Sequence, residues 1–462
     1  MARVMLIEPP FAAFMGFSRW FYPVGLSFLA DDLMQQGHDV EIFDADHTDS
    51  TTCFTYLEML DLFPQYRLAV SDLAHPIYTA IVDEIKRFQP DVVGISCMTV
   101  KVPSAVAIAR LVKQNTGPAV VCGGPHATAL PEQLLEYDCI DYVVRGSALP
   151  GFTDLVNSVV GLSGTRPERI AGLTYRLAGG SIEHGPEDND LSVLKQRRPR
   201  REALRNADTY SHRDLSIIMT SFGCPYRCRF CSNSIHNSLA YRSLSDVFEE
   251  ISTIVVTYGS GSLYFRDDTF SASTRRLKKI TDYIAGHQGI RDWECLTRID
   301  TLDADRLQML SRSKCSMLKV GIESGSERIL KRIDKKLTPT DVVNFAKTVR
   351  DANLHWSAFF MIGFPEETEQ DIQDTIRLIE QCRPDHVSMS LFTPYPGSQY
   401  YDDLLRNGQF TADLDWGAMD PFCLVPQFRR AIPERRFDTL AREVMAFVDH
   451  YNNGQISQPA SA

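Results

Sequence analysis

The interpretation of this chain depends on the stretch Cys224-Pro-Tyr-Arg-Cys228-Arg-Phe-Cys231. It places three thiols within eight residues, spaced CxxxCxxC, directly after the apolar run 217–223. Such a run predicts a short buried strand that ends in a Gly-marked turn, so the thiols are expected on a loop at the strand's carboxyl end. Soft thiolates at this spacing suit an iron–sulfur or a zinc site.

Zinc and disulfide readings of the thiols are the alternatives. A Cys₃His zinc site would take His236 as its fourth ligand, but structural zinc modules usually bring paired CxxC units and no second pair follows. A disulfide would leave one of the three neighbouring thiols unpaired. The other eight of the 11 cysteines are scattered singly, which argues against chance clustering and indicates a reducing compartment. Three ligands on a four-iron cluster leave one iron open to another molecule.

The N-terminal third alternates apolar runs with helical patterns, which is typical of a doubly wound parallel sheet. Strands are expected at Val4–Ile7, Val40–Phe43, Asp91–Ser96, Ala119–Gly123 and Tyr142–Val144. Helices are expected at Gly25–Gln36, Ile77–Phe88, Ser104–Gln114 and Pro131–Tyr137. Ligands of such sheets bind outside the carboxyl ends of the strands. A nicotinamide site is not expected, because the first turn reads Glu8-Pro9-Pro10-Phe11 rather than GxGxxG.

From Ser216 the alternation of strands and helices restarts and predicts a partial (β/α)6 barrel. Its strands are expected at Ser216–Thr220, Ser262–Phe265, Trp293–Arg298, Met317–Gly321, Trp356–Ile362 and His386–Leu391. Its helices are expected at Val247–Thr257, Thr274–Ala285, Ala304–Ser313, Ser326–Arg332, Asp341–Ala352 and Glu369–Cys382, with a further one at Arg435–Tyr451.

Between the two units the sequence predicts a hairpin and a linker. Gly172–His184 alternates around Gly179-Gly180, which is typical of a hairpin. A polar connector follows, and its basic run Lys195–Arg201 is interpreted as a solvated linker rather than a nucleic-acid patch. The predicted division is a Rossmann-like domain over 1–165, hairpin and linker over 166–210, barrel over 211–400 and a helical extension over 401–462.

The spacing CxxxCxxC, with Phe230 just before the third cysteine, resembles the radical S-adenosylmethionine (SAM) superfamily. The resemblance implies that Cys224, Cys228 and Cys231 hold a 4Fe–4S cluster whose fourth iron is chelated by SAM. The implied SAM contacts are Phe230, Asp267, Arg298, Glu323, Ser324, Met361 and Gly363. The alternatives are helix capping for Asp267 and for Ser324 or Ser326, and a surface ion pair for Arg298.

The order of sheet, linker and barrel is similar to the cobalamin-dependent branch of that superfamily, which includes methyltransferases and anaerobic porphyrin-cyclase-like members. Cobalamin contacts are then expected at Pro9, Pro10, Ser96, Met98, Thr99, Gly123, Gly124, Pro125, His126, Arg145 and Gly146. No histidine is expected on cobalt, and His38, His47 and His75 are expected at the surface. After Arg145-Gly146 the chain has Ser147 where relatives often carry a carboxylate. The alternative is a sheet that merely packs on the barrel.

The resemblance implies an enzyme, in the first place a methyltransferase. It would act on an unactivated carbon, or a phosphinate phosphorus, of a small molecule through a 5′-deoxyadenosyl radical and methylcobalamin. Radical oxidation, cyclisation or rearrangement without methyl transfer is the second reading, and a non-catalytic cobalamin or metal sensor the third. Reduction of the cluster implies an external electron donor such as flavodoxin or ferredoxin.

Composition limits the location and the partners of the chain. The net charge of −11 argues against non-specific nucleic-acid binding. No apolar run approaches the roughly 20 residues of a membrane span, and no signal-peptide cleavage site is apparent, so a cytoplasmic protein is expected. The loop after the first strand carries aromatic residues that are expected either in the core or as a cap over the pocket: Phe11, Phe14, Phe17, Trp20 and Phe21.

Overall fold

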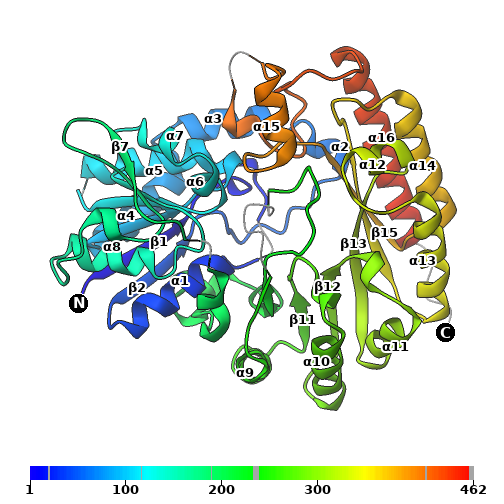
Figure 1. The fold of residues 1–462 in the computed structure, drawn as a ribbon, viewed down its shortest axis with the longest axis horizontal. Coiled ribbons are helices and arrows are strands. Elements are labelled where there is room, and N and C mark those ends of the chain that lie inside the picture. The colour runs from blue at the N-terminus through cyan, green and yellow to red at the C-terminus, as the bar shows by residue number, and fades with distance from the viewer. Residues whose placement is uncertain (19–20, 116, 189, 233–238, 412–413, 457–462) are drawn as a thin grey trace.

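The structure is a computed structural model that describes residues 1–456 except 19–20, 116, 189, 233–238 and 412–413. It contains two large sheets that lie side by side (Figure 1). The first belongs to the N-terminal part of the chain and the second follows the thiol loop. The described helices include none that is long and apolar enough to cross a membrane.

The first sheet has seven strands in the order β2-β1-β3-β4-β5-β6-β7. Five of them are parallel: β1 (Arg3–Glu8), β2 (Asp39–Asp44), β3 (Val92–Ser96), β4 (Ala119–Gly123) and β5 (Tyr142–Val144). All five were predicted, to within a residue or two at each end. The predicted hairpin also forms, as β6 (Leu173–Arg176) and β7 (Ile182–His184). It pairs antiparallel with β5 and so extends the first sheet rather than standing apart from it.

Helices cover both faces of this sheet because its strands alternate apolar side chains between the faces. Val4 and Leu6 of β1 pack with α1 (Val24–Gln35) and α8 (Gly151–Val159). Met5 and Ile7 pack on the other face with α4 (Pro76–Phe88) and α5 (Val102–Asn115). The remaining helices of this part are α2 (Tyr56–Met59), α3 (Phe63–Ser71), α6 (Pro125–Ala129) and α7 (Pro131–Leu135).

The second sheet has six parallel strands in the order β15-β14-β13-β12-β11-β8. Their bounds are β8 (Ile217–Ile218), β11 (Ser262–Phe265), β12 (Asp292–Thr297), β13 (Cys315–Glu323), β14 (Trp356–Ile362) and β15 (His386–Leu391). In the described part of the chain the end strands β8 and β15 do not pair, so the sheet is open, as a partial barrel requires. A short antiparallel pair, β9 (Ser221–Phe222) and β10 (Ala240–Tyr241), adjoins β8.

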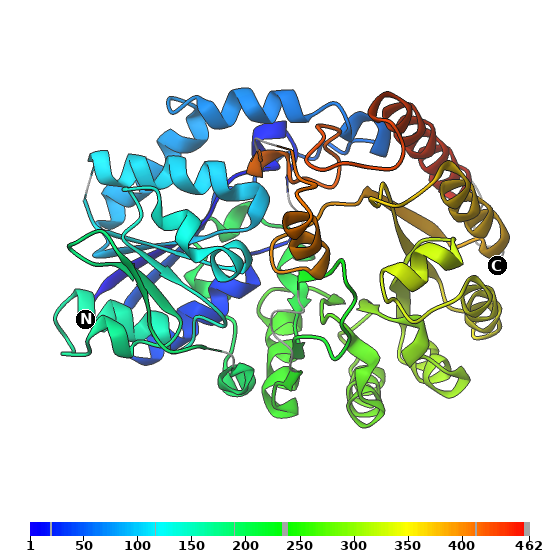
Figure 2. The ribbon, with the colours of Figure 1, turned by 45° about the horizontal axis from the view of Figure 1, so that its top comes forward.

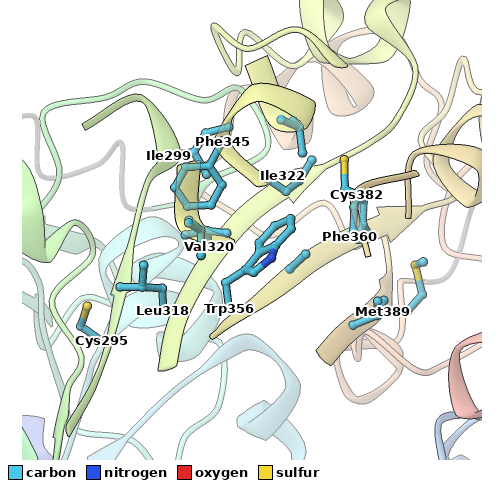
Figure 3. Packing of buried hydrophobic residues seen from close by; sticks show 14 of the residues in the cluster. Cys295, Ile299, Leu318, Val320, Ile322, Phe345, Trp356, Phe360, Cys382 and Met389 are labelled. Atoms are coloured by element: carbon cyan, nitrogen blue, oxygen red, sulfur yellow. The ribbon is translucent and has the colours of Figure 1, made fainter. Parts of the chain in front are cut away.

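An arc of helices lies outside the second sheet (Figure 2). It consists of α9 (Leu244–Val256), α10 (Thr274–Gly286), α11 (Ala304–Arg312), α13 (Pro339–Asp351), α14 (Glu369–Cys382) and α16 (Glu434–Ile456). The shorter helices α12 (Glu327–Arg332) and α15 (Gln399–Arg406) share one apolar cluster, and α15 lies between the two sheets. Figure 3 shows the core between strands and helices, where Leu318, Val320 and Ile322 of β13 alternate toward Phe345 of α13. This period of two leaves the intervening side chains for the inner face of the sheet.

The basic run Lys195–Arg201 was interpreted as a solvated linker, which is right for Lys195 and Arg198, both exposed, and wrong for Arg201. Arg201 is buried and donates to Leu215 O, to Ile217 O and to Glu250 of α9. Arg200 pairs with the buried Asp31 of α1. The run therefore fastens the connector to both units through charges that the acidic residues of α1 and α9 balance.

Candidate active site

The three thiols follow β9 on a loop at the carboxyl edge of the second sheet. Gly223 turns the chain with φ +79°, a conformation that favours glycine. Cys228 is buried, while Cys224 and Cys231 are partly exposed. Cys224 Sγ lies 3.5 Å from Thr269 Oγ1, and the Cys231 N–H donates to Cys228 O at 3.0 Å. Burial raises the pKa of Cys228, and the nearby positive charges of Lys335 and Arg298 oppose that rise.

The donor set fits an iron–sulfur cluster better than a single ion. Among the described residues, no three His, Cys, Asp or Glu side chains converge closely enough to hold one metal ion. His236, the fourth ligand of the zinc alternative, lies outside the described residues. Three soft thiolates near cationic side chains are the donors that a four-iron cluster takes from a protein, with its irons spread over several ångströms.

Asp267 holds the segment that precedes the thiol loop by accepting its hydrogen bonds. Its carboxylate is fully buried and accepts from Thr220 N at 3.1 Å, from Thr220 Oγ1 at 2.8 Å and from Ser221 Oγ. Burial raises the pKa of Asp267, and these hydrogen bonds oppose the rise. The predicted helix-capping alternative is wrong, because Ser273 caps α10. The Asp267 carboxylate is not exposed toward the place where SAM was expected, since it faces the backbone between β8 and β9.

Arg298 follows β12 and connects Cys228 to the segment after α12. Its Nη1 lies 3.4 Å from Cys228 Sγ, and its Nη2 donates to Lys335 O at 2.8 Å. A bidentate pair with Asp300 at 2.9 and 2.8 Å orients the guanidinium. The ion pair that was the alternative does form, with the exposed Asp300. Arg298 itself is buried, so the pair is not a fully exposed surface pair.

Glu323 ends β13 at a register shift in the pairing with β14, and Ser324 follows it. Glu323 is buried, accepts from Lys335 Nζ at 2.7 Å and has φ +77°. A left-handed backbone at a non-glycine residue stores strain and is often found at functional sites. Ser324 is fully buried and its Oγ accepts from Ser326 N at 3.1 Å, while Ser326 caps α12. The capping alternative is thus confirmed for Ser326.

Met361 and Gly363 end β14 opposite the thiol loop. Met361 and Phe230 pack against the same apolar cluster, which includes Phe364, so the end of the fifth strand and the thiol loop adjoin one core. Gly363 has φ +92°, donates its N–H to the Glu367 carboxylate and accepts from Arg430 Nε at 3.1 Å. The backbone N–H and C=O of Gly363, an implied SAM contact, are therefore engaged within the protein.

A cavity of about 410 Å³ lies at the carboxyl edge of the first sheet, beside α1. Five of the predicted cobalamin residues line it: Ser96, Gly123, Gly124, Pro125 and Gly146. Its opposite wall was not predicted and comes from α1, from α8 and from the second unit, through Phe28, Phe152, Met219 and Phe222. The apolar residues of the predicted helix Gly25–Gln36 were the available signal for that wall.

Two glycines of the cavity lining, Gly25 and Gly123, keep space open for a large ligand. A Cβ added at Gly25 would meet no atom within 4 Å, and one at Gly123 would touch Val144 O at 3.6 Å. Side chains at these positions would therefore occupy free volume rather than collide. A mostly apolar cavity of this size, with few polar groups, is typical of a cofactor site and fits the tail and edge of cobalamin.

The other predicted cobalamin residues lie outside the cavity lining: Pro9, Pro10, Met98, Thr99, His126 and Arg145. His126 is buried between Thr99 Oγ1 at 3.2 Å and Gln133 Oε1 at 3.0 Å, and burial lowers its pKa to about 4. Arg145 donates to Gly185 O of the connector at 3.1 Å. The expectation of surface histidines was also wrong for His38 and His47, which are buried.

A carboxylate of the connector lies beside Ser147, the residue that follows Arg145-Gly146. Asp188 is nearly buried, and its Oδ2 accepts from Ser147 Oγ at 2.7 Å. Burial raises the pKa of Asp188, and the hydrogen bond from Ser147 opposes the rise. A residue about forty positions away in sequence thus places an acid beside the cavity, which a local motif could not reveal.

The aromatic side chains of the loop after β1 lie in two places, the core of the first unit and the surface of the second. Phe11 and Phe14 are buried in the core of the first unit. Phe21 stacks under the Arg266 guanidinium at 4.1 Å and lines a second cavity, of about 320 Å³, at the amino ends of β11 and β12. That cavity lies at the opposite end of the strands from the thiols. Trp20 lies outside the described residues.

Comparisons with known proteins agree with this geometry. The family model described as "B12 binding domain" matches residues 20–156, and that of the radical SAM superfamily matches residues 218–379. An uncharacterised methyltransferase of Pyrococcus horikoshii is 32% identical over 391 residues, which cover 83% of this chain and 79% of that protein. The cytidylyl-2-hydroxyethylphosphonate methyltransferase of Streptomyces wedmorensis is 24% identical, over 88% of this chain and 82% of that one.

A solved structure shares the fold. The radical SAM methyltransferase TsrM of Kitasatospora setae matches with a TM-score of 0.68 and 16% identity, over 96% of this chain and 89% of that chain. The two matched family models fall on the two sheets described above, one with the glycine-lined cavity and one with the thiol loop. The chain therefore belongs to the cobalamin-binding radical SAM enzymes, with a 4Fe–4S cluster, SAM and cobalamin as its cofactors and methyl transfer as its reaction class.

Proposed function

We propose that this enzyme transfers a methyl group to an unactivated carbon, or to a phosphinate phosphorus, of a small molecule. The observation that carries the proposal is a shared wall: Met219 and Phe222 line the cobalamin-sized cavity, and Cys224 follows Phe222 by two residues. When bound, the cluster and SAM supply a 5′-deoxyadenosyl radical and cobalamin supplies the methyl group. A substrate at this wall would be within reach of both.

The protein's own residues would hold and shield these groups. Cys224, Cys228 and Cys231 are the proposed cluster ligands. Arg298 and Lys335 place positive charge beside Cys228, which favours the thiolate that binds iron. Phe230 and Met361 cover the loop with apolar surface. The apolar wall of the cavity, which includes Phe28 and Phe152, would exclude water from the cobalamin site.

The test is anaerobic reconstitution with iron, sulfide and hydroxocobalamin, followed by reaction with SAM and a reductant. We expect the wild type to bind about four irons per chain and to form both 5′-deoxyadenosine and S-adenosylhomocysteine. Cys228→Ser should lose cluster absorbance and SAM cleavage. Cys53→Ser, at an exposed cysteine of the first unit, is the matched control and should behave as the wild type.

The products separate the competing functions. 5′-Deoxyadenosine without S-adenosylhomocysteine would favour radical oxidation, cyclisation or rearrangement. No cleavage of SAM by the reduced, loaded protein would favour a sensor. The proposal extends to a cytoplasmic location and to an external one-electron donor of the flavodoxin or ferredoxin type, which is tested by replacing the chemical reductant with the reduced donor protein.

A further inference from the structure

Glu8, at the end of β1, is a charged residue of the first sheet that lines the cavity. It ends β1, two residues after Leu6, so both side chains point to the α1 face of the sheet. Among the described residues that line the cavity, Glu8 alone has an acidic or basic side chain. Its neighbours there include Leu26, Phe28 and Phe152, and Glu8 itself is 8% exposed.

A buried lysine holds this carboxylate in place. Lys101 follows β3 and is fully buried. Its Nζ pairs with Glu8 Oε1 and, at 2.8 Å, with Asp46 Oδ2. The other Asp46 oxygen accepts from the N–H groups of Phe11 and Ala13, so Asp46 secures the loop after β1. Glu8 is the member of this group that reaches from the lysine to the cavity.

The surroundings carry more carboxyl groups than Lys101 balances. Asp44 of β2 stands beside Glu8 in the strand register, and burial and the charge of Glu8 raise the pKa of Asp44 to about 6. A buried ion pair rarely stabilises a fold more than apolar packing would. Charge kept at the rim of an apolar cavity instead suits recognition of a ligand that donates hydrogen bonds.

We propose that Glu8 binds cobalamin, its carboxylate accepting a hydrogen bond from an N–H or O–H group of the cofactor while Lys101 fixes its position. Cobalamin offers such donors both on the amide side chains of the corrin ring and on the ribose of its nucleotide tail. The proposal rests on cobalamin occupying this cavity. It adds a specific contact that the local sequence Glu8-Pro9-Pro10 did not indicate.

The test is titration of the full-length, cluster-free protein with hydroxocobalamin, followed by the quenching of intrinsic fluorescence. Glu8→Gln keeps the size of the side chain but removes its charge, and should weaken binding about tenfold. Glu41→Gln is the matched control, because Glu41 lies on the adjacent β2 and pairs with Arg87 outside the cavity. Equal affinity of Glu8→Gln and wild type would overturn the proposal.

A second variant separates a lost contact from a disturbed fold. In Glu8→Gln/Lys101→Met both partners of the ion pair are removed. Because Asp46 then also loses its lysine, the thermal midpoint of the cluster-free protein checks folding. Cobalamin affinity should stay low in this variant. Recovery of wild-type affinity would show that the single substitution acted through Lys101 and would refute the contact.

Cobinamide, which lacks the nucleotide tail, identifies the donor. If Glu8→Gln weakens cobinamide as much as cobalamin, the partner is a corrin amide; if cobalamin alone is weakened, it is the tail. Failure of the wild type to bind hydroxocobalamin would be a different result, since it would remove cobalamin from the proposed function.

Discussion

Arg298 is oriented by its neighbours before any ligand binds. Asp300 takes two of its N–H groups, Lys335 O a third, and Cys228 Sγ lies 3.4 Å from Nη1. The Tyr226 ring covers the guanidinium at 3.8 Å. The sequence predicted the residue and its place at the end of the third strand. It could not predict Asp300 as the orienting partner, because a carboxylate two residues along often points to solvent.

Replacement of Arg298 by lysine tests this arrangement. The shorter ammonium side chain would keep one charge but could not satisfy Asp300, Lys335 O and the thiol side together, since it lacks the planar fork. In Arg298→Lys we expect SAM to bind about tenfold more weakly, corresponding to one charged hydrogen bond of roughly 1.5 kcal/mol, with iron content retained. Equilibrium binding of SAM to the reconstituted protein measures this, and Arg306→Lys on α11 serves as the control. Unchanged affinity would exclude Arg298 from SAM binding.

At the scale of an element, Glu367 holds the turn after β14. It is fully buried, its carboxylate accepts from Gly363 N, and among the described residues its Oε1 has no hydrogen-bond partner. Burial raises the pKa of Glu367 to about 8, above its ordinary 4.5. Folding therefore favours the protonated acid, and the native state binds a proton that the unfolded chain releases between these two values.

The pH dependence of unfolding should show this proton. The stability that Glu367 contributes is fully present below pH 4.5 and falls as pH rises to about 8, where the native acid ionises. The slope is at most about 1.4 kcal/mol per pH unit. Glu367→Gln cannot ionise, so relative to the wild type it should gain stability as pH rises from 5 to 8. Chemical unfolding at pH 5, 6.5 and 8 measures the difference, and parallel curves would contradict a raised pKa.

The helix α1 gives a second prediction at this scale. Gly25 lies in its first turn and lines the cavity, and an added Cβ would meet no atom within 4 Å. Alanine is favoured over glycine in helices by up to about 1 kcal/mol. Gly25→Ala should therefore leave the cluster-free protein at least as stable, while the methyl group narrows the cavity and weakens hydroxocobalamin binding. Thermal melting should show an equal or higher midpoint for Gly25→Ala, and titration should show a lower affinity for hydroxocobalamin. An unchanged affinity would mean that cobalamin binds elsewhere.

Local pattern accounts for the elements that the sequence predicted. The strand Trp356–Ile362 and the helix Glu369–Cys382 form with their predicted bounds, because apolar periodicity and a Thr368 cap define them locally. The helices α3 and α8 were not predicted. The cavity's far wall and the Glu8–Lys101 pair depend on contacts between distant segments, which one sequence does not display.

At the scale of the whole molecule, charges from distant segments join the two units. Asp449 of α16 accepts from the N–H groups of Tyr56 and Leu57 at the start of α2, at 2.8 and 2.9 Å. On the other side, Glu250 of α9 lies between Arg201 of the connector and Arg242. Arg242 is fully buried, and its guanidinium lies 5.1 Å from the ring of Phe28 on α1, a cavity residue.

Glu250 should therefore matter both for stability and for the cavity. Glu250→Gln would leave two buried guanidinium groups without their carboxylate, a change that typically costs about 3–5 kcal/mol. The same variant should bind hydroxocobalamin more weakly, because Arg242 contacts the Phe28 side of the cavity and donates to the carbonyl of Met219, another lining residue.

Glu249→Gln is the matched control. This neighbour on α9 has a 59% exposed side chain and pairs with Arg198 at the surface, so a loss of about 1 kcal/mol or less in unfolding free energy is expected. Because a buried pair is poorly screened, the loss in Glu250→Gln should persist at high salt. Chemical unfolding at low and high salt tests this, and similar effects of the two substitutions would mean that the connector does not join the two units.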